Sequence, residues 1–133
     1  MPELCHCGLN KTFDNCCGRF LTAGHLPKTP EQLMRSRYVA YALGGYGDYL
    51  LSTWFAATAG ALTAETLSEK TVDWVKLDVL SAQQTGDKAT VEFKAHFRNA
   101  DQSSVQIMHE ISVFQRTKGH WLYVGGEIST QNH

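Results

Sequence analysis

The chain has 133 residues, of which 43% are hydrophobic and 19% are charged. This length supports one hydrophobic core, because two separate cores would each be near the lower size limit for stability. Twelve Lys and Arg against thirteen Asp and Glu give a net charge of -1, which excludes the broad positive field of most nucleic-acid-binding domains. We therefore expect one compact unit and no sequence-specific nucleic-acid partner.

The chain also lacks the patterns of membrane insertion and export. Its longest apolar run, residues 38–43, is far shorter than the roughly 20 residues that cross a bilayer. The N-terminus does not combine a basic segment with a hydrophobic one, as a secretion signal does. These features predict a cytoplasmic protein with no membrane span.

All four cysteines lie near the N-terminus, at Cys5, Cys7, Cys16 and Cys17. Four thiolates are the ligand set of a closed structural zinc site. Gly8 and Gly18 directly follow the two pairs, where the backbone of a zinc knuckle has to turn sharply. The spacing therefore predicts a structural zinc ion, with His6 as a bystander rather than a fifth ligand.

Two other uses of these cysteines remain open. Two disulfides fit less well, because Cys16 and Cys17 would form a strained ring if bonded to each other and cytosolic thiols stay reduced. Redox chemistry of the thiols is the second alternative.

After this cysteine-rich segment the sequence predicts helices. Thr29 precedes a proline, which is a favourable pair for the N-cap and the first turn of a helix over residues 30–43. The glycine pair at 44–45 ends the helical spacing of apolar residues. Two further helices are expected, over residues 48–54 with Asp48 as the N-cap and, more weakly, over residues 63–70.

The second half of the chain has the two-residue period of β-strands. In residues 88–98 apolar and polar side chains alternate without interruption, as in a half-buried antiparallel strand. Further strands are expected over residues 74–83, 105–113 and 121–125, and the turn at 85–87 predicts a hairpin. Helices followed by strands in meander order indicate an α+β fold, with the helices on one face of a bent antiparallel sheet.

His109 is the most informative residue outside the cysteines. It shares the register of the apolar residues of strand 105–113, so we expect its side chain on the apolar face and Glu110 on the opposite face. Such a histidine is either a general acid or base in a pocket or a core residue bonded to a carbonyl or a Tyr hydroxyl. The second is favoured, because spacing places no other titratable group beside it.

The other pocket candidates are Tyr41, Asp48, Trp54 and Trp121. Helix capping alone explains Asp48, and a pocket carboxylate is the alternative. The basic residues concentrate at Lys11, Arg19, Arg35 and Arg37, with Lys28 between them. We interpret them as a solvated flank with salt bridges, and the alternative is a contact for phosphate, RNA or an acidic partner.

Two sets of residues resemble known families. The run Cys5-His6-Cys7-Gly8 through Cys16-Cys17-Gly18 resembles the SEC-C motif, the zinc-binding element at the C-terminus of the SecA translocation ATPase and in many bacterial proteins. Residues 33–38, 48–50, 53–54, 109–114 and 119–123 resemble the YchJ-like family of uncharacterised bacterial proteins. Many members of that family carry a second SEC-C motif, which is not found here up to His133.

The resemblance implies a nuclear transport factor 2-like (NTF2-like) cone, in which helices pack on a curved antiparallel sheet around a pocket. It divides the chain into a SEC-C-like zinc-binding cap at residues 1–20 and an NTF2-like α+β domain at residues 21–133. Zinc is then the expected cofactor, in a structural role, and no catalytic residues are assigned.

Three functions follow as hypotheses. The favoured one is a non-enzymatic interaction module whose zinc cap contacts a protein or ribosomal partner. The alternative is a small-molecule-binding protein or enzyme that uses the cone pocket around His109, which rests on analogy of fold. A redox or metal-sensing role of the thiols is the third.

Overall fold

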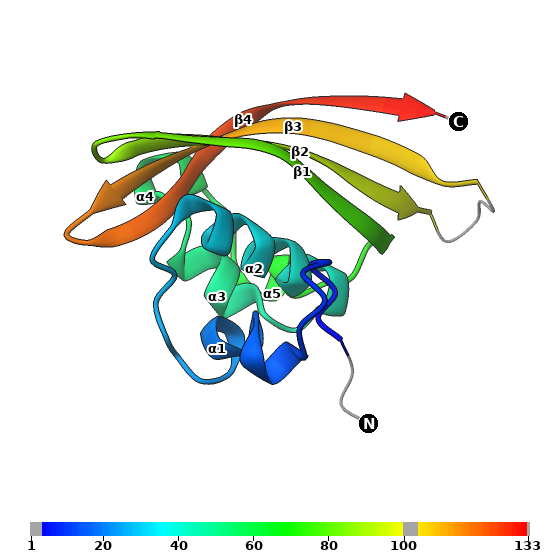
Figure 1. The fold of residues 1–133 in the computed structure, drawn as a ribbon, viewed down its shortest axis with the longest axis horizontal. Coiled ribbons are helices and arrows are strands. Elements are labelled where there is room, and N and C mark those ends of the chain that lie inside the picture. The colour runs from blue at the N-terminus through cyan, green and yellow to red at the C-terminus, as the bar shows by residue number, and fades with distance from the viewer. Residues whose placement is uncertain (1–3, 100–103, 133) are drawn as a thin grey trace.

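A curved four-stranded antiparallel sheet packs against a layer of helices in the computed structural model, which describes residues 4–99 and 104–132 (Figure 1). The strands lie side by side in chain order: β1 Asp73–Thr85, β2 Lys88–Arg98, β3 Gln106–Thr117 and β4 His120–Asn132. The helices cover the concave face of the sheet. The predicted α+β class and the meander order are confirmed.

The helical layer is built around one long helix. Its elements are η1 Phe13–Asn15, α1 Gly18–Leu21, α2 Pro30–Leu43, α3 Gly47–Ser52, α4 Ala56–Ala59 and α5 Ala64–Leu67. The Thr29 side chain accepts a hydrogen bond from the Gln32 backbone N–H and so caps α2 as expected. Gly44 ends α2 with a φ of 74°, a conformation that glycine adopts without steric cost. No helix in the described segments is long and apolar enough to cross a membrane.

The start of α3 differs from the prediction. Tyr46 is the N-cap, and Asp48 lies one residue inside the first turn with its side chain exposed. Its carboxylate makes no capping bond, although an acidic group in the first turn of a helix remains favourable. The prediction of Asp48 as the cap is therefore wrong by two positions.

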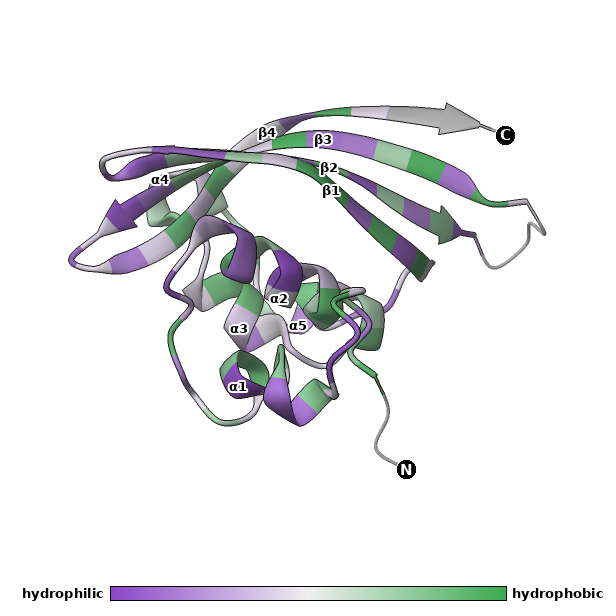
Figure 2. Ribbon diagram, in the orientation of Figure 1, coloured by the Kyte–Doolittle hydropathy of each residue, from purple (hydrophilic) through white to green (hydrophobic). Residues whose placement is uncertain are grey.

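β2 alternates as predicted, with Ala89, Val91, Phe93 and Ala95 buried toward the helices. Figure 2 shows this alternation of hydrophobic and hydrophilic residues along the strands. Register shifts interrupt the pairing of β1 with β2 between Trp74 and Lys76 and between Val79 and Ser81. These irregularities bend the outer strand of the sheet.

The face assignment of β3 is reversed from the prediction. Glu110 and Ser112 pair with Phe93 and Val91 of β2, so they point toward the helices, and both are buried. His109 pairs with Lys94 and lies on the outer face of the sheet. The apolar residues Ile111 and Val113 share that outer face and are 40% and 41% exposed. A shift of one residue exchanges the two faces of a strand, and here the more polar set is the inner one.

The core lies between α2 and the sheet. Leu33, Val39 and Val91 are completely buried, and Phe114 is nearly so. The four cysteines belong to the same cluster of buried residues. The N-terminal segment is thus packed into the main core and is not a detached appendage.

The close contact between α3 and α5 gives a test of this packing. A Cβ atom on Gly47 would lie 1.7 Å from the Ala64 carbonyl oxygen, so Gly47→Ala forces the two helices apart. We expect a loss of about 3 kcal/mol in the free energy of unfolding, measured by urea titration. Gly125→Ala is the control, because nothing lies within 4 Å of its Cβ position. Equal unfolding midpoints for the two variants would contradict this packing.

Candidate metal centre and cavity

The four cysteine sulfurs form one compact group. Their Sγ atoms all lie within 4.8 Å of one another, and all four residues are buried. None forms a disulfide, and the Cys7 and Cys16 sulfurs are 3.4 Å apart, well beyond bonding distance. A tetrahedral ion about 2.3 Å from each sulfur would place the sulfurs about 3.8 Å apart. The geometry therefore fits a four-thiolate metal site.

Local backbone structure brings the two cysteine pairs together. The Cys5 N–H donates to the Lys11 carbonyl at 2.7 Å, which closes the loop that carries the first pair. Gly8 turns this loop with a φ of 89°. The Cys16 N–H donates to the Phe13 carbonyl at 3.0 Å, so η1 positions the second pair just before α1. His6 is exposed and does not belong to the group.

The buried cysteines affect one another's protonation. Hydrogen bonds from Cys17 and Cys7 lower the pKa of Cys5, while the bond to Cys5 raises the pKa of Cys17. Burial raises the pKa of Cys16 to about 12. Four thiolates at this density require a positive ion among them.

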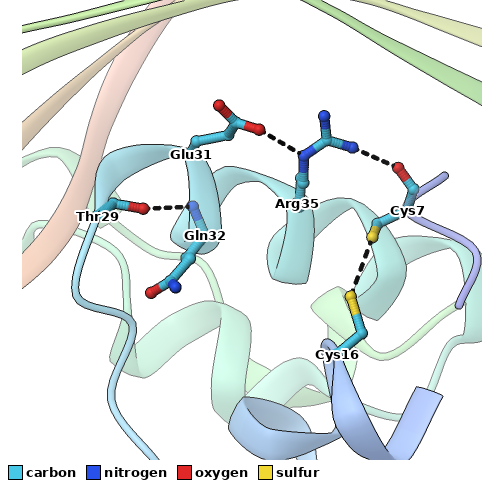
Figure 3. A network of polar contacts seen from close by, with 6 residues as sticks. All are labelled: Cys7, Cys16, Thr29, Glu31, Gln32 and Arg35. Carbon is cyan, nitrogen blue, oxygen red and sulfur yellow. Dashed lines mark hydrogen bonds and ion pairs between the residues drawn. The ribbon is translucent and has the colours of Figure 1, made fainter. Parts of the chain in front are cut away.

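Arg35 joins the knuckle, defined as residues 5–17, to helix α2. Its Nη1 donates to the Cys7 carbonyl at 2.6 Å, and its Nε donates to Glu31 at 2.8 Å, as Figure 3 shows. The Arg35 side chain that makes these two contacts is only 13% exposed. The orientation of the knuckle on the core thus depends on this guanidinium.

The predicted basic residues do not form one exposed patch. Lys11 is exposed, whereas Arg19 is half-buried and donates to the Cys16 carbonyl at 2.8 Å. Arg35 faces the knuckle, and Arg37 is 5% exposed and points into the core. Of the interpretation as a solvated flank with salt bridges, the salt bridge forms at Arg35, with Glu31, but neither guanidinium is solvated, because Arg35 contacts the knuckle and Arg37 is buried.

A cavity of about 260 Å³ lies between α2 and the sheet. Its wall is mostly apolar and aromatic, with contributions from Trp54, Trp74, Phe93 and Phe114. Polar groups enter it at Arg37, Tyr41, Glu110, Ser112 and Tyr123. Ile128 also lines the cavity and is 57% exposed, which places it at the rim. An apolar space with a few convergent polar groups is the usual form of a small-molecule site.

Arg37 is the buried cation of this cavity. Its Nη1 donates to the Leu50 carbonyl at 2.7 Å and to Thr53 Oγ1 at 2.6 Å. Its guanidinium carbon lies 4.8 Å from the centre of the Trp54 ring and 4.6 Å from that of Tyr123. Burial lowers the pKa of Arg37, but an arginine starts so high that it stays charged at neutral pH. The two rings and the two oxygens compensate part of this charge.

Glu110 is the buried anion. Its Oε2 accepts hydrogen bonds from the Ser112 hydroxyl and, at 3.0 Å, from the Tyr123 hydroxyl. A Cβ atom at Gly126 would lie 2.8 Å from the same oxygen, so the glycine leaves space for the carboxylate. Burial, followed by the charge of Glu110, raises the pKa of Tyr123, which keeps this hydroxyl a donor.

The backbone of Tyr123 is also fixed. Its N–H donates to the Thr53 carbonyl and its carbonyl accepts from the Phe55 N–H, both at 2.7 Å. These bonds form a short parallel bridge between Trp54 and Tyr123, whose rings meet edge to face. The segment after α3 is thus attached to β4 beside the cavity.

The structure separates the predicted pocket residues. Tyr41 and Trp54 line the cavity. Trp121 is buried elsewhere, with the Arg116 guanidinium 5.0 Å from its ring centre, and Asp48 is exposed on α3. His109 is on the outer face, where its Nε2 lies 2.7 Å from Glu92, so it is neither a cavity residue nor a core histidine. This corrects the prediction for His109.

Sequence reasoning missed Arg37 and Glu110 as cavity residues. The signal for Glu110 was its register with Met108, Ser112 and Phe114, which the more hydrophobic odd-numbered residues of β3 outweighed. Arg37 has a weaker signal, because an arginine one turn before Tyr41 is ordinarily solvated.

Comparison with known proteins identifies relatives over nearly the whole chain. The family model described as the middle NTF2-like domain of YchJ matches residues 29–126. A UPF0225 protein of Yersinia pestis is 39% identical over 132 residues, which cover 95% of this chain and 84% of the relative. A UPF0225 protein of Yersinia pseudotuberculosis has the same identity and coverage.

Solved structures agree with the fold. A SEC-C motif containing protein from Rhodopseudomonas palustris is 36% identical with a TM-score of 0.82, covering 96% of this chain and 98% of its own. A SEC-C motif containing protein from Psychrobacter arcticus is 25% identical with a TM-score of 0.75, covering 97% of this chain and 83% of its own.

The raised pKa of Tyr123 predicts a loss of stability at alkaline pH. The folded protein holds this proton more tightly than the unfolded chain, whose tyrosines titrate near pH 10. The stabilisation is complete below that pH and is lost as the pH rises through the folded-state pKa. Its slope reaches about 1.4 kcal/mol per pH unit. Guanidinium titrations should give a shallower slope for Tyr123→Phe, and an unchanged slope would contradict the assignment.

Proposed function

The chain belongs to the YchJ-like family, whose middle domain has the NTF2-like fold, and we propose that it binds a small molecule and that a structural zinc ion holds its N-terminal knuckle together. The proposal divides the chain into a zinc-binding cap at residues 1–20 and a ligand-binding domain at residues 21–133. We further place the protein in the cytoplasm, because buried free thiols persist in a reducing compartment.

The zinc part of the proposal is supported by the donor set. Four sulfurs within 4.8 Å of one another, with no carboxylate or histidine of the described residues among them, match a closed structural zinc site rather than a catalytic one. Burial of all four sulfurs disfavours the redox alternative, because reactive cysteines are partly exposed. The zinc would hold the knuckle against α2 and the core.

The binding part is supported by one observation: buried Arg37 and Glu110 both line the same apolar cavity. Two charged side chains in a small domain are costly to bury, and replacing them by apolar residues is often neutral or stabilising. A site that recognises a polar ligand explains why they are there. The alternative is an interaction module whose zinc cap contacts a protein or ribosomal partner, and Arg35 and Arg37 add no exposed basic surface to such a contact.

Metal analysis tests the zinc site. We expect the untreated protein to contain one zinc ion per chain by mass spectrometry, and its removal by a chelator to lower the free energy of unfolding by about 3 kcal/mol or more. Cys16→Ser should lose zinc, whereas His6→Ala, which changes an exposed neighbour in the same loop, should keep it. A metal-free protein with unchanged stability would refute the site.

A thermal-shift screen with a chemically diverse library tests ligand binding. A ligand at 100 times its Kd stabilises the fold by about 2.7 kcal/mol, which is readily detected as a rise in Tm. Ile128→Trp places a large side chain at the cavity rim and should abolish this rise. Leu80→Trp is the matched control, because Leu80 is 50% exposed on β1 and does not line the cavity. Hits that stabilise both variants equally would place binding elsewhere.

A further inference from the structure

The cavity holds two opposite charges that do not pair with each other. No nitrogen of Arg37 lies within 4.0 Å of a carboxylate oxygen of any described residue, and its hydrogen bonds end on uncharged oxygens. Glu110 likewise has no cation in contact among the described residues, and its bonds come from two hydroxyls. The guanidinium and the carboxylate attract each other only across the intervening space.

The hydrogen bonds to each charge involve one of its terminal atoms. Both hydrogen bonds from Arg37 leave through Nη1, and Tyr41 also contacts the guanidinium. Both bonds to Glu110 end on Oε2, so no described residue donates to Oε1. A carboxylate can accept from donors at both of its oxygens, so Glu110 has capacity left for a ligand ammonium.

The indole of Trp54 is a third cavity group with a hydrogen-bonding atom that the described part of the fold does not use. Trp54 Nε1 is buried and has no acceptor among the described residues. Its ring lies against Arg37 and lines the cavity. An anionic oxygen at Arg37 would supply an acceptor in this neighbourhood, which is the usual requirement of a buried indole N–H.

We propose that the cavity selects small zwitterions, with the ligand carboxylate at Arg37, its ammonium at Glu110 and an apolar or aromatic body against the ring-lined wall. The inference rests on the proposed function and names the ligand class of that site. A zwitterion completes both buried charges at once, whereas a singly charged ligand leaves one of them uncompensated.

Calorimetric titration with matched probes tests this selection. L-Phenylalanine and 4-(aminomethyl)benzoate are zwitterions that differ in the separation of their charges. Their controls are 3-phenylpropanoate with phenethylamine, and 4-methylbenzoate with 4-methylbenzylamine, which each keep one charge. We expect at least one zwitterion to bind at least tenfold more tightly than both of its singly charged analogues, and to shift the Trp54 indole N–H resonance.

Glu110→Gln tests the ammonium contact. The amide oxygen still accepts from the Ser112 and Tyr123 hydroxyls, but the negative charge is gone, so the preferred zwitterion should lose its advantage over the matching carboxylate. Glu92→Gln is the control, because Glu92 pairs with His109 on the outer face of the sheet and should leave the affinity ranking unchanged.

The outcomes separate this inference from the proposed function. If neutral or singly charged library compounds bind in the cavity while neither zwitterion is preferred, the zwitterion class is wrong and ligand binding stands. If no library compound and no probe binds, both are refuted. If Glu110→Gln keeps the full zwitterion preference, the proposed placement of the ammonium is overturned.

Discussion

The buried guanidinium of Arg37 connects three parts of the fold. It belongs to α2, its hydrogen-bond acceptors lie at and just after the end of α3, and one of its two stacking rings belongs to β4. A charged group in the core is tolerated only where such partners are fixed in place. The positions of α3 and of the Trp54 segment relative to the sheet therefore depend on this residue.

The same helix holds the N-terminal knuckle. Arg35, two residues before Arg37, lies on the opposite side of α2 and donates to the Cys7 carbonyl. Side chains two residues apart on a helix point in nearly opposite directions. The short segment from Arg35 to Arg37 therefore contacts the cysteine knuckle on one side of α2 and lines the cavity on the other. This arrangement explains how a segment with little regular structure is integrated into a single core with the sheet.

Local signals predicted the fold well, and the site less well. The Thr29 cap, the glycine stop of α2 and the alternation in β2 depend on neighbouring residues only, and the structure contains each of them. On the inner face of β3, Glu110 accepts a hydrogen bond from Ser112 of its own strand and one from Tyr123 of β4, and the contact from β4 cannot be read from the local pattern. Arg37 was misplaced for a similar reason, because its acceptors lie 13 and 16 residues away in the chain.

The bridge between Trp54 and Tyr123 has a consequence for self-association. β4 is an outer strand of an open sheet, and unpaired outer strands invite a strand from another molecule to add on. Here the N–H and carbonyl of Tyr123 are already used within the chain. On the other outer strand, β1, the two register shifts interrupt the regular spacing that a foreign strand would need. Each border of the open sheet is thus interrupted, β4 at Tyr123 and β1 at its register shifts, which shortens the regular edge that a foreign strand could pair with.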